Sequence, residues 1–434
     1  MNVLMLNPPF KGRFSRTSRS PAVTLGGTIY YPFWLAYATG VLEQSGFQVS
    51  FIDAPAQGLS VADVIERVKK EPPQLIVVDT STPSIYSDVK VAEQLKERFP
   101  SSFVTLVGTH PSALPEETLK LSEKVDAVAV GEYDYTMSDL AFCLEKKEDL
   151  RTVDGLVFFR DGKQIIRNKP RVLIENVDAL PFVSQVYKRH LNIRDYYFAA
   201  ANYPMVMIIT GRGCPYKCFF CVYPQTFHSR KYRSRSAASV VDEFQWIVQN
   251  IPQVREIGIE DDTFTIDQER VKEICRQILE RGIKIKWYCN VRVNLELETM
   301  RWMKKAGCRL VTVGFESADQ ESLNRMQKGI TVAQIRQFVQ DTRKAGLLVH
   351  GCFIIGNPGE TTETMEKSLE MARELNCDTM QFLPASWLSG RQWKKSSGGR
   401  RKTVILFPRA LPTGQTKAAC TAACSIFPDF PPKR

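Results

Sequence analysis

The sequence has no long apolar run. Although 44% of its 434 residues are hydrophobic, no stretch approaches the roughly 18–20 consecutive apolar residues of a membrane helix. The first residues, MNVLMLNPP, are typical of a strand and a loop rather than of a secretion signal. We therefore expect a cytoplasmic protein without a transmembrane segment, long enough for two or three domains.

The chain also has little net charge once its last part is set aside. Of the 58 basic and 47 acidic residues behind the formal charge of +11, the segment 381–434 holds ten basic residues and one acidic residue, Asp429. The remaining chain is nearly balanced. An excess of positive charge confined to a tail argues against a nucleic-acid partner.

The sequence lacks the context in which cysteines indicate disulfide bonds, because eleven cysteines suggest a disulfide framework only in a short secreted chain. Six of the eleven cysteines are scattered singly through apolar or helical stretches, as small buried side chains are. Three others share the loop GRGCPYKCFFC (211–221) with the spacing C-x3-C-x2-C, and no fourth cysteine follows closely. Cys420 and Cys424 lack a third partner, so we expect no second cluster in the tail.

Residues 1–145 alternate short β-rich runs with amphipathic helices. This pattern predicts an α/β domain with a parallel, doubly wound (Rossmann-like) sheet that binds its ligand at the carboxyl ends of the strands. The predicted strands are 3–6, 48–52, 75–79, 103–107 and 127–130. Residues 146–200 break this rhythm and predict a hairpin turning at Asp161-Gly162, followed by a connector.

A second β/α series fills residues 201–385. Six strand-and-helix units predict a partial (β/α)6 barrel with its chemistry at the carboxyl ends of the strands. The predicted strands are 205–209, 256–260, 286–290, 310–315, 349–355 and 379–383. The three-cysteine loop directly follows the first of them, which is a functional position in such a fold.

Thiolates bind zinc or iron, and the count of three helps to choose between them. A structural zinc site is closed by four ligands, whereas three cysteines that hold a [4Fe-4S] cubane leave one iron open to an outside molecule. The glycines at 211 and 213 allow the backbone to wrap closely around such a cluster. We therefore predict Cys214, Cys218 and Cys221 as cluster ligands at the catalytic centre, with zinc or a metal-free loop as alternatives.

This loop, followed by barrel strands, resembles the radical S-adenosylmethionine (SAM) superfamily. The stretches EDDTFT (260–265), CNVRV (289–293), GFES (314–317) and GCFIIGNPGE (351–360) are similar to the strand-end motifs that hold SAM there. The resemblance implies that the open iron binds SAM and that an electron from the cluster releases a 5′-deoxyadenosyl radical. It places SAM contacts at Phe220, Asp261, Asp262, Arg292, Glu316, Ser317 and Gly356.

A doubly wound domain before such a barrel resembles the cobalamin (B12)-binding class of these enzymes. The chain resembles the branch with hopanoid-associated and magnesium-protoporphyrin monomethyl ester cyclase-like members, and the stretches PQT and YRSRS after the cluster loop are similar to its hopanoid-associated enzymes. By this resemblance, loops after the strands embrace cobalamin. They place its contacts at Asn7, Pro8, Pro9, Ser81, Thr82, Gly108, Thr109, His110, Gly131 and Glu132.

Two motifs are absent from this first domain. No G-x-G-x-x-G follows residues 3–6, which argues against a dinucleotide, although a nucleotide-binding or structural domain stays an alternative. The loop after the first strand also lacks the histidine with which many cobalamin proteins ligate cobalt. We expect no histidine on cobalt, and we expect His110 to contact the corrin tail.

The remaining segments carry weaker signals. The basic stretch 223–236 is typical of a surface turn or an anion contact, with Ser236 capping the next helix. His228 lies close to the cluster loop in sequence and is a candidate for handling protons. Residues 386–434 match nothing in the family, so we interpret them as a disordered basic tail or the product of a frameshift.

Together these features predict a cobalamin-dependent radical SAM enzyme that methylates an unactivated carbon. The alternatives are a cyclase or rearrangement enzyme acting on a lipid-linked sugar or tetrapyrrole, and a non-catalytic iron–sulfur electron carrier. The expected partners are a small-molecule or lipid-like substrate and a reducing protein such as flavodoxin or ferredoxin.

Overall fold

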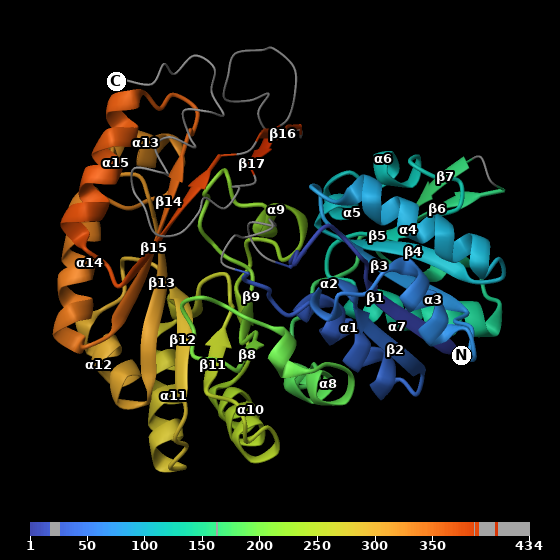
Figure 1. The fold of residues 1–434 in the computed structure, drawn as a ribbon, viewed down its shortest axis with the longest axis horizontal. Coiled ribbons are helices and arrows are strands. Elements are labelled where there is room, and N and C mark those ends of the chain that lie inside the picture. Colours follow the sequence, from blue (N-terminus) through green and yellow to red (C-terminus); the bar gives the residue numbers. More distant parts are fainter. Residues whose placement is uncertain (18–26, 162–163, 386, 390–403, 407–434) are drawn as a thin grey trace. The chain divides into compact units, whose positions relative to one another are not determined.

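The structure, a computed structural model, describes residues 1–17, 27–161, 164–385, 387–389 and 404–406 (Figure 1). Contacts divide these residues into two compact units. The first unit comprises 1–17, 29–161, 164–196 and 222–234, and the second comprises the rest. The predicted turn residue Gly162 and most of the predicted tail, with Cys420 and Cys424, lie outside the described residues.

The first unit is built on a seven-stranded sheet of order β2-β1-β3-β4-β5-β6-β7. Its first five strands are parallel and the β6–β7 hairpin continues the sheet antiparallel to β5. The strands are β1 (Asn2–Asn7), β2 (Gln48–Asp53), β3 (Leu75–Thr80), β4 (Phe103–Gly108), β5 (Ala127–Ala129), β6 (Leu156–Arg160) and β7 (Gln164–Arg167). The predicted hairpin therefore continues the sheet of the first unit.

Helices cover this sheet on both faces, because β1 runs on to β2 in one direction while β3 runs on to β4 in the other. Helix α1 packs on α7 and α8, and α3 packs on α4. The helices are α1 (Phe33–Gln44), α2 (Ala54–Gln57), α3 (Val61–Val68), α4 (Ile85–Arg98), α5 (Thr109–Ala113), α6 (Pro115–Leu119), α7 (Asp134–Lys146), α8 (Val183–His190) and α9 (Tyr223–Thr226). Short 3-10 turns η1 (Leu150–Thr152), η2 (Val177–Ala179) and η3 (Ile193–Asp195) and the two-residue β10 (Arg233–Ser234) complete the unit.

The strand order reverses between β1 and β3, so this unit has a topological switch point there. The register aligns the strand ends: Asn7 lies beside Asp53, and Thr80 lies beside Gly108. Strand β3 is buried along its whole length, as its sequence LIVVDT predicts for a central strand. Polar side chains at the ends of these strands therefore gather at one edge of the sheet.

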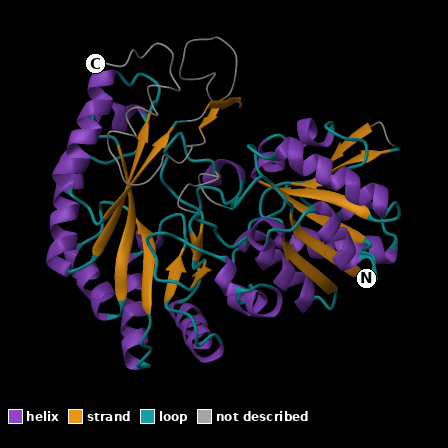
Figure 2. Ribbon diagram, in the orientation of Figure 1, coloured by secondary structure: helices purple, strands orange, loops and turns teal. Residues whose placement is uncertain are grey.

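The second unit contains six parallel strands in sequential order, β8-β11-β12-β13-β14-β15. They are β8 (Met205–Ile208), β11 (Glu256–Ile259), β12 (Lys286–Val291), β13 (Cys308–Glu316), β14 (Leu348–Ile355) and β15 (Thr379–Pro384). The helices that line the same side of this sheet are α11 (Gln268–Glu280), α12 (Leu297–Lys305), α14 (Val332–Ala345) and α15 (Thr362–Leu375) (Figures 1 and 2). The order is that of a partial (β/α)6 barrel, as predicted.

The helices of this unit begin at clear sequence signals. Ser236 caps α10 by accepting from the backbone N–H of Ser239, as its sequence position predicted. Thr331 and Thr361 form capping boxes at α14 and α15. The helices are α10 (Ala237–Asn250), α11 (Gln268–Glu280), α12 (Leu297–Lys305), α13 (Gln320–Arg325), α14 (Val332–Ala345) and α15 (Thr362–Leu375). Smaller elements are β9 (Gly211–Arg212), η4 (Phe264–Ile266), β16 (Trp387–Ser389) and β17 (Val404–Leu406).

In the part of the chain that the structure describes, no helix has the length and apolar character to cross a bilayer.

Candidate functional site

The three-cysteine loop follows β8 and lies within the second unit. Cys214 and Cys218 are buried, and Cys221 is half-buried. Gly213 has a φ of +88°, which glycine adopts readily, and it turns the chain immediately before the first cysteine. Burial, together with the charge of nearby Asp262, raises the pKa of the Cys214 thiol. The loop thus presents its sulfurs at the carboxyl end of the first barrel strand.

Across the described residues, no group of three or more Cys, His, Asp or Glu side chains lies close enough together to hold a metal ion. The donor set itself suits iron–sulfur chemistry, because three soft thiols come from one short loop. The residues that back this loop also fit a sulfur-bound cluster. Arg292 directs its Nη1 to the Cys218 sulfur at 3.8 Å, and donors of this kind stabilise thiolate ligands.

The predicted SAM carboxylates at the end of β11 have different surroundings. Asp261 is buried and accepts from the Thr210 backbone N–H at 2.5 Å and from its hydroxyl at 2.6 Å. Burial raises the pKa of Asp261. Asp262 is half-buried and its charge acts on Cys214. Asp261 therefore anchors the start of the cysteine loop, and Asp262 is the better placed of the two to meet a ligand.

The end of β13 shows backbone strain and a buried ion pair. Glu316 has a φ of +68°, which is uncommon for a residue other than glycine and typical of functional positions. Its carboxylate pairs with Lys328 at 2.6 Å, and both side chains are almost fully buried. Ser317 donates to Glu360 at 3.5 Å, and Gly356 has a φ of +86° after β14. The predicted SAM residues of β13 and β14 thus follow two adjacent strands.

Sequence reasoning missed the loop between α13 and α14. The Phe219 backbone N–H donates to the Met326 carbonyl at 3.1 Å, and Lys328 lies 5.8 Å from the ring centroid of Phe220. Phe219 and Phe220 also pack against the buried Ile354. Lys328 is a single lysine in a short loop, and no motif or periodicity marks it in the sequence. The contacts of this loop with the cysteine loop can therefore be recognised only in the structure.

In the first unit, the predicted cobalamin residues of the β1 loop are held by buried polar contacts. Asn7 donates to Asp53 at 2.8 Å and accepts from Arg16 at 2.7 Å. Arg16 also donates to the Pro8 carbonyl at 2.8 Å and pairs with Asp88 at 2.6 Å, with both side chains fully buried. The structure therefore fixes the backbone of this loop, with its Pro8-Pro9 step, at the sheet edge.

The predicted residues after β3, β4 and β5 lie along the same edge. Gly108 has a φ of +112°, and a Cβ there would stand 2.2 Å from the Thr80 carbonyl oxygen. Thr82 contacts His110 Nδ1 at 3.1 Å, and burial lowers the pKa of His110 to about 4, so this ring is neutral at pH 7. Of the remaining predicted residues, Thr109 begins α5, the Ser81 hydroxyl lies 2.9 Å from that of Ser84, and the Gly131 backbone N–H donates to Ser112 at 3.0 Å.

Two buried carboxyls at this edge were not predicted as site residues. Burial raises the pKa of Asp53 to about 6 and that of Asp79 to about 7. Asp53 accepts from Tyr196 at 2.9 Å, whereas Asp79 Oδ2 has no hydrogen-bond partner among the described residues. The available sequence signal was an aspartate in one of the last two positions of a strand: Asp53 is the last residue of β2, and Asp79 is the next to last of β3. At this edge Gly108 lets another group come close to the backbone, and Asp79 offers a buried hydrogen-bond acceptor. Both features fit a corrin, whose periphery carries many amide groups.

Glu132, also predicted to contact cobalamin, is engaged by the protein itself. Its carboxylate pairs with Arg233 at 2.6 and 2.9 Å, and both side chains are buried. His228, the candidate proton handler, is likewise buried. It lies 4.2 Å from the ring of Trp34 and 5.5 Å from that of Tyr223, centroid to centroid. Glu132 therefore forms a buried ion pair, and His228 packs among aromatic side chains, both within the first unit.

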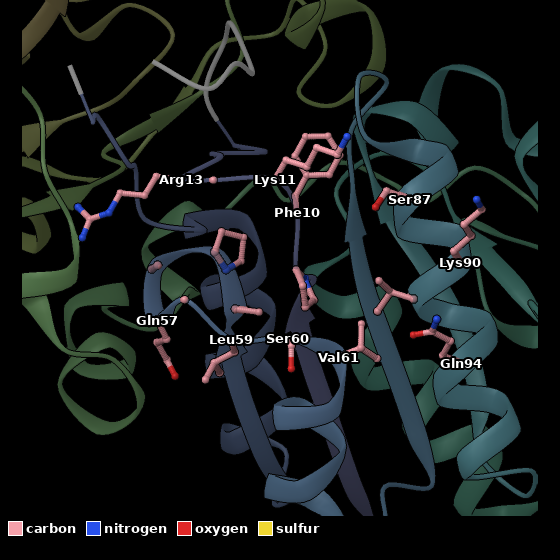
Figure 3. Close-up of a pocket in the computed structure, with 17 residues that line it drawn as sticks. Phe10, Lys11, Arg13, Gln57, Leu59, Ser60, Val61, Ser87, Lys90 and Gln94 are labelled. Carbon is pink, nitrogen blue, oxygen red and sulfur yellow. The ribbon is translucent and has the colours of Figure 1, made fainter. Parts of the chain in front are cut away.

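A hollow of about 920 Å³ opens in the first unit beside the ends of β1 and β2 (Figure 3). Residues 9–13, residues 54–61 and one side of α4 line it. Its charged lining consists of Lys11, Arg13 and Lys90, with no carboxylate among the described residues. Of the predicted cobalamin residues, it contains Pro9 alone. The hollow and the predicted residues after β3, β4 and β5 therefore occupy different parts of the unit.

Comparison with known proteins agrees with this geometry. Residues 20–141 match the B12 binding domain and residues 208–372 match the radical SAM superfamily. An uncharacterised methyltransferase of Pyrococcus horikoshii is 33% identical over 397 residues, which cover 91% of this chain and 83% of that protein. The chain belongs to the cobalamin-binding radical SAM family. It is a radical SAM enzyme whose cofactors are a [4Fe-4S] cluster, SAM and cobalamin, as predicted.

Other proteins to which this chain is similar have names that describe different activities. The anaerobic magnesium-protoporphyrin IX monomethyl ester cyclase of Cereibacter sphaeroides is 28% identical over 83% of this chain and 58% of its own. The hopanoid C-3 methylase of Methylococcus capsulatus is 24% identical over 79% of this chain and 64% of its own. The methyltransferase TsrM of Kitasatospora setae shares the fold, with a TM-score of 0.70 at 19% identity over 89% of this chain and 73% of TsrM.

Proposed function

We propose that this enzyme transfers a methyl group to an unactivated carbon of a small molecule. The observation that carries the proposal is the presence in one chain of a three-cysteine loop after β8 and a domain that matches the B12 binding domain, with a sheet edge that only glycine fits at residue 108. The methyltransferase relatives from Pyrococcus and Methylococcus support it.

In this proposal the cluster supplies the electron that cleaves SAM, and cobalamin supplies a carrier for the methyl group. The residues of the chain hold these groups and shape the site. Cys214, Cys218 and Cys221 bind the cluster, and Asp262 and Glu316 bind SAM through charge-assisted hydrogen bonds. Phe219 and Phe220, packed on Ile354, shield the cysteine loop from water.

We further propose a lipid-like small molecule as substrate and a flavodoxin or ferredoxin as electron donor in the cytoplasm. The similarity to the hopanoid enzyme supports the lipid-like substrate. The need of the cluster for single electrons supports the donor, since flavodoxins and ferredoxins deliver electrons one at a time.

The test is an anaerobic assay of the full chain with iron, sulfide and cobalamin supplied. Candidate lipids and a reductant are added, and 5′-deoxyadenosine, S-adenosylhomocysteine and product mass are followed. Methyl transfer yields both SAM-derived products and a substrate heavier by one CH2 group. Cleavage of SAM without any mass gain on a consumed substrate would contradict methylation.

Ring formation or rearrangement is a second candidate, because the cyclase of Cereibacter sphaeroides is 28% identical. The same assay distinguishes it, since a rearranged product contains no added methyl carbon. Formation of 5′-deoxyadenosine in either case excludes a protein that only carries electrons.

A further inference from the structure

Arg292 lies just after β12 and is almost fully buried, with 6% of its surface exposed. Its guanidinium carbon stands 3.6 Å from the ring centroid of Tyr216, a residue of the cysteine loop. Tyr216 is itself fixed by Asn294, whose amide donates to the tyrosine hydroxyl at 3.2 Å. Since a planar guanidinium stacks well on an aromatic ring, this contact aligns Arg292 with the loop.

The two ends of the guanidinium have different partners. Nη1 reaches the Cys218 sulfur at 3.8 Å, and Nη2 donates to the carbonyl of Lys328. Lys328 in turn is held by its ion pair with Glu316. The arginine is thus clamped between the cysteine loop and the loop after α13, with one N–H directed at a cluster ligand.

A donor in this position affects the energetics of a cluster. Reduction adds negative charge that spreads over the cysteine sulfurs, and hydrogen bonds to those sulfurs set the reduction potential. Arginine stays charged at all accessible pH values, so it favours the more negative, reduced form. Burial strengthens the effect, because little water screens the charge.

We propose that Arg292 is a positioning residue that donates a hydrogen bond to Cys218 and raises the reduction potential of the cluster. This role differs from the contact with SAM that the sequence predicts for Arg292. It concerns the iron–sulfur centre alone, so it holds whether the reaction is methylation or cyclisation.

The experiment compares Arg292→Gln and Arg292→Lys with the unmodified chain after anaerobic reconstitution. The control is Arg281→Gln, which removes a partly exposed arginine paired with Asp242 in the same unit. Iron content, the midpoint potential from a redox titration followed by electron paramagnetic resonance without SAM, and the SAM dissociation constant are measured. We expect R292Q to keep its iron and shift to a more negative potential, R292K to shift less, and R281Q not to shift.

Two results would overturn the proposal. An unchanged potential in R292Q, with SAM binding weakened tenfold or more, would assign Arg292 to SAM alone. Loss of iron from both Arg292 variants, with circular dichroism like that of the unmodified chain, would make Arg292 necessary for holding the cluster rather than for tuning it.

Discussion

Residue 108 has no room for a side chain. Its φ of +112° strains any other residue, and a Cβ would collide with the Thr80 carbonyl. We expect Gly108→Ala to destabilise the protein by about 2–4 kcal/mol, since backbone strain costs about 1–3 kcal/mol and the overlap adds to it. Thermal unfolding measures the loss, and the cobalamin content of the purified protein should fall with it.

Gly131 provides the matched control. Its φ is also positive, +79°, but a Cβ there would meet nothing within 4 Å. Gly131→Ala should therefore show the backbone penalty without the collision. Equal destabilisation of the two variants would show that the predicted collision with the Thr80 carbonyl adds nothing to the loss of stability.

The raised pKa of Asp79 predicts that the free energy of unfolding depends on pH. It is surrounded by Arg16, Asp53 and Asp88, and burial raises its pKa from 3.8 to about 7. Below about pH 4 the carboxyl is protonated in both folded and unfolded chains. As pH rises towards 7 the unfolded chain loses this proton first, so folding becomes less favourable, and above about pH 7 the whole cost is present.

Asparagine at this position cannot ionise, so we expect Asp79→Asn to gain stability relative to the unmodified chain between pH 5 and pH 8. The gain is at most about 4 kcal/mol, because one pKa unit corresponds to about 1.4 kcal/mol. Chemical unfolding at several pH values measures it. A difference between D79N and the unmodified chain that does not change with pH would contradict the raised pKa of Asp79.

At the scale of elements, residues 222–234 directly follow Cys221, the last of the three predicted cluster ligands, and fold into the first unit. The buried pair of Arg233 and Glu132 holds this segment, with Arg233 also donating to the Ile174 carbonyl at 2.8 Å. Glu132→Gln leaves a buried guanidinium without its counter-charge, so we expect a loss of about 3–5 kcal/mol. Thermal unfolding measures this loss.

Lys231 of the same segment forms an exposed ion pair that serves for comparison. Lys231 and Glu175 lie 2.7 Å apart with more than half of each side chain exposed. Glu175→Gln should cost less than about 1 kcal/mol, because water screens such pairs. A loss for E132Q as small as that for E175Q would mean that Arg233 does not depend on Glu132.

For the whole molecule, the parallel strands of the two large sheets were predictable because each contains an apolar β-rich run. Strand β3 and the long β14 lie within one residue of their predicted ends. The cysteine loop was predictable for another reason: its three ligands are local in sequence. Signals confined to one short segment need no knowledge of the fold.

Contacts between distant segments were beyond sequence reasoning. Arg16 and Asp88 are 72 residues apart, and neither motif nor periodicity links them. Glu132 was assigned to cobalamin from its place after β5, yet its carboxylate binds Arg233, which lies 101 residues further along the chain. Buried ion pairs of this kind depend on which loops the fold brings together, and that information is spread over the whole chain.

The separation of the predicted ligands between two units leads to a last prediction. All predicted cobalamin residues lie in the first unit, and the three cysteines predicted to bind the cluster lie in the second. Replacing Cys214, Cys218 and Cys221 together by alanine should abolish iron binding and 5′-deoxyadenosine formation while leaving the cobalamin content unchanged. A control that replaces Cys143, Cys275 and Cys352 removes as many thiols and should keep the iron. Loss of cobalamin from the first variant, at unchanged circular dichroism, would show that the B12-binding sheet needs the cluster to hold its own cofactor.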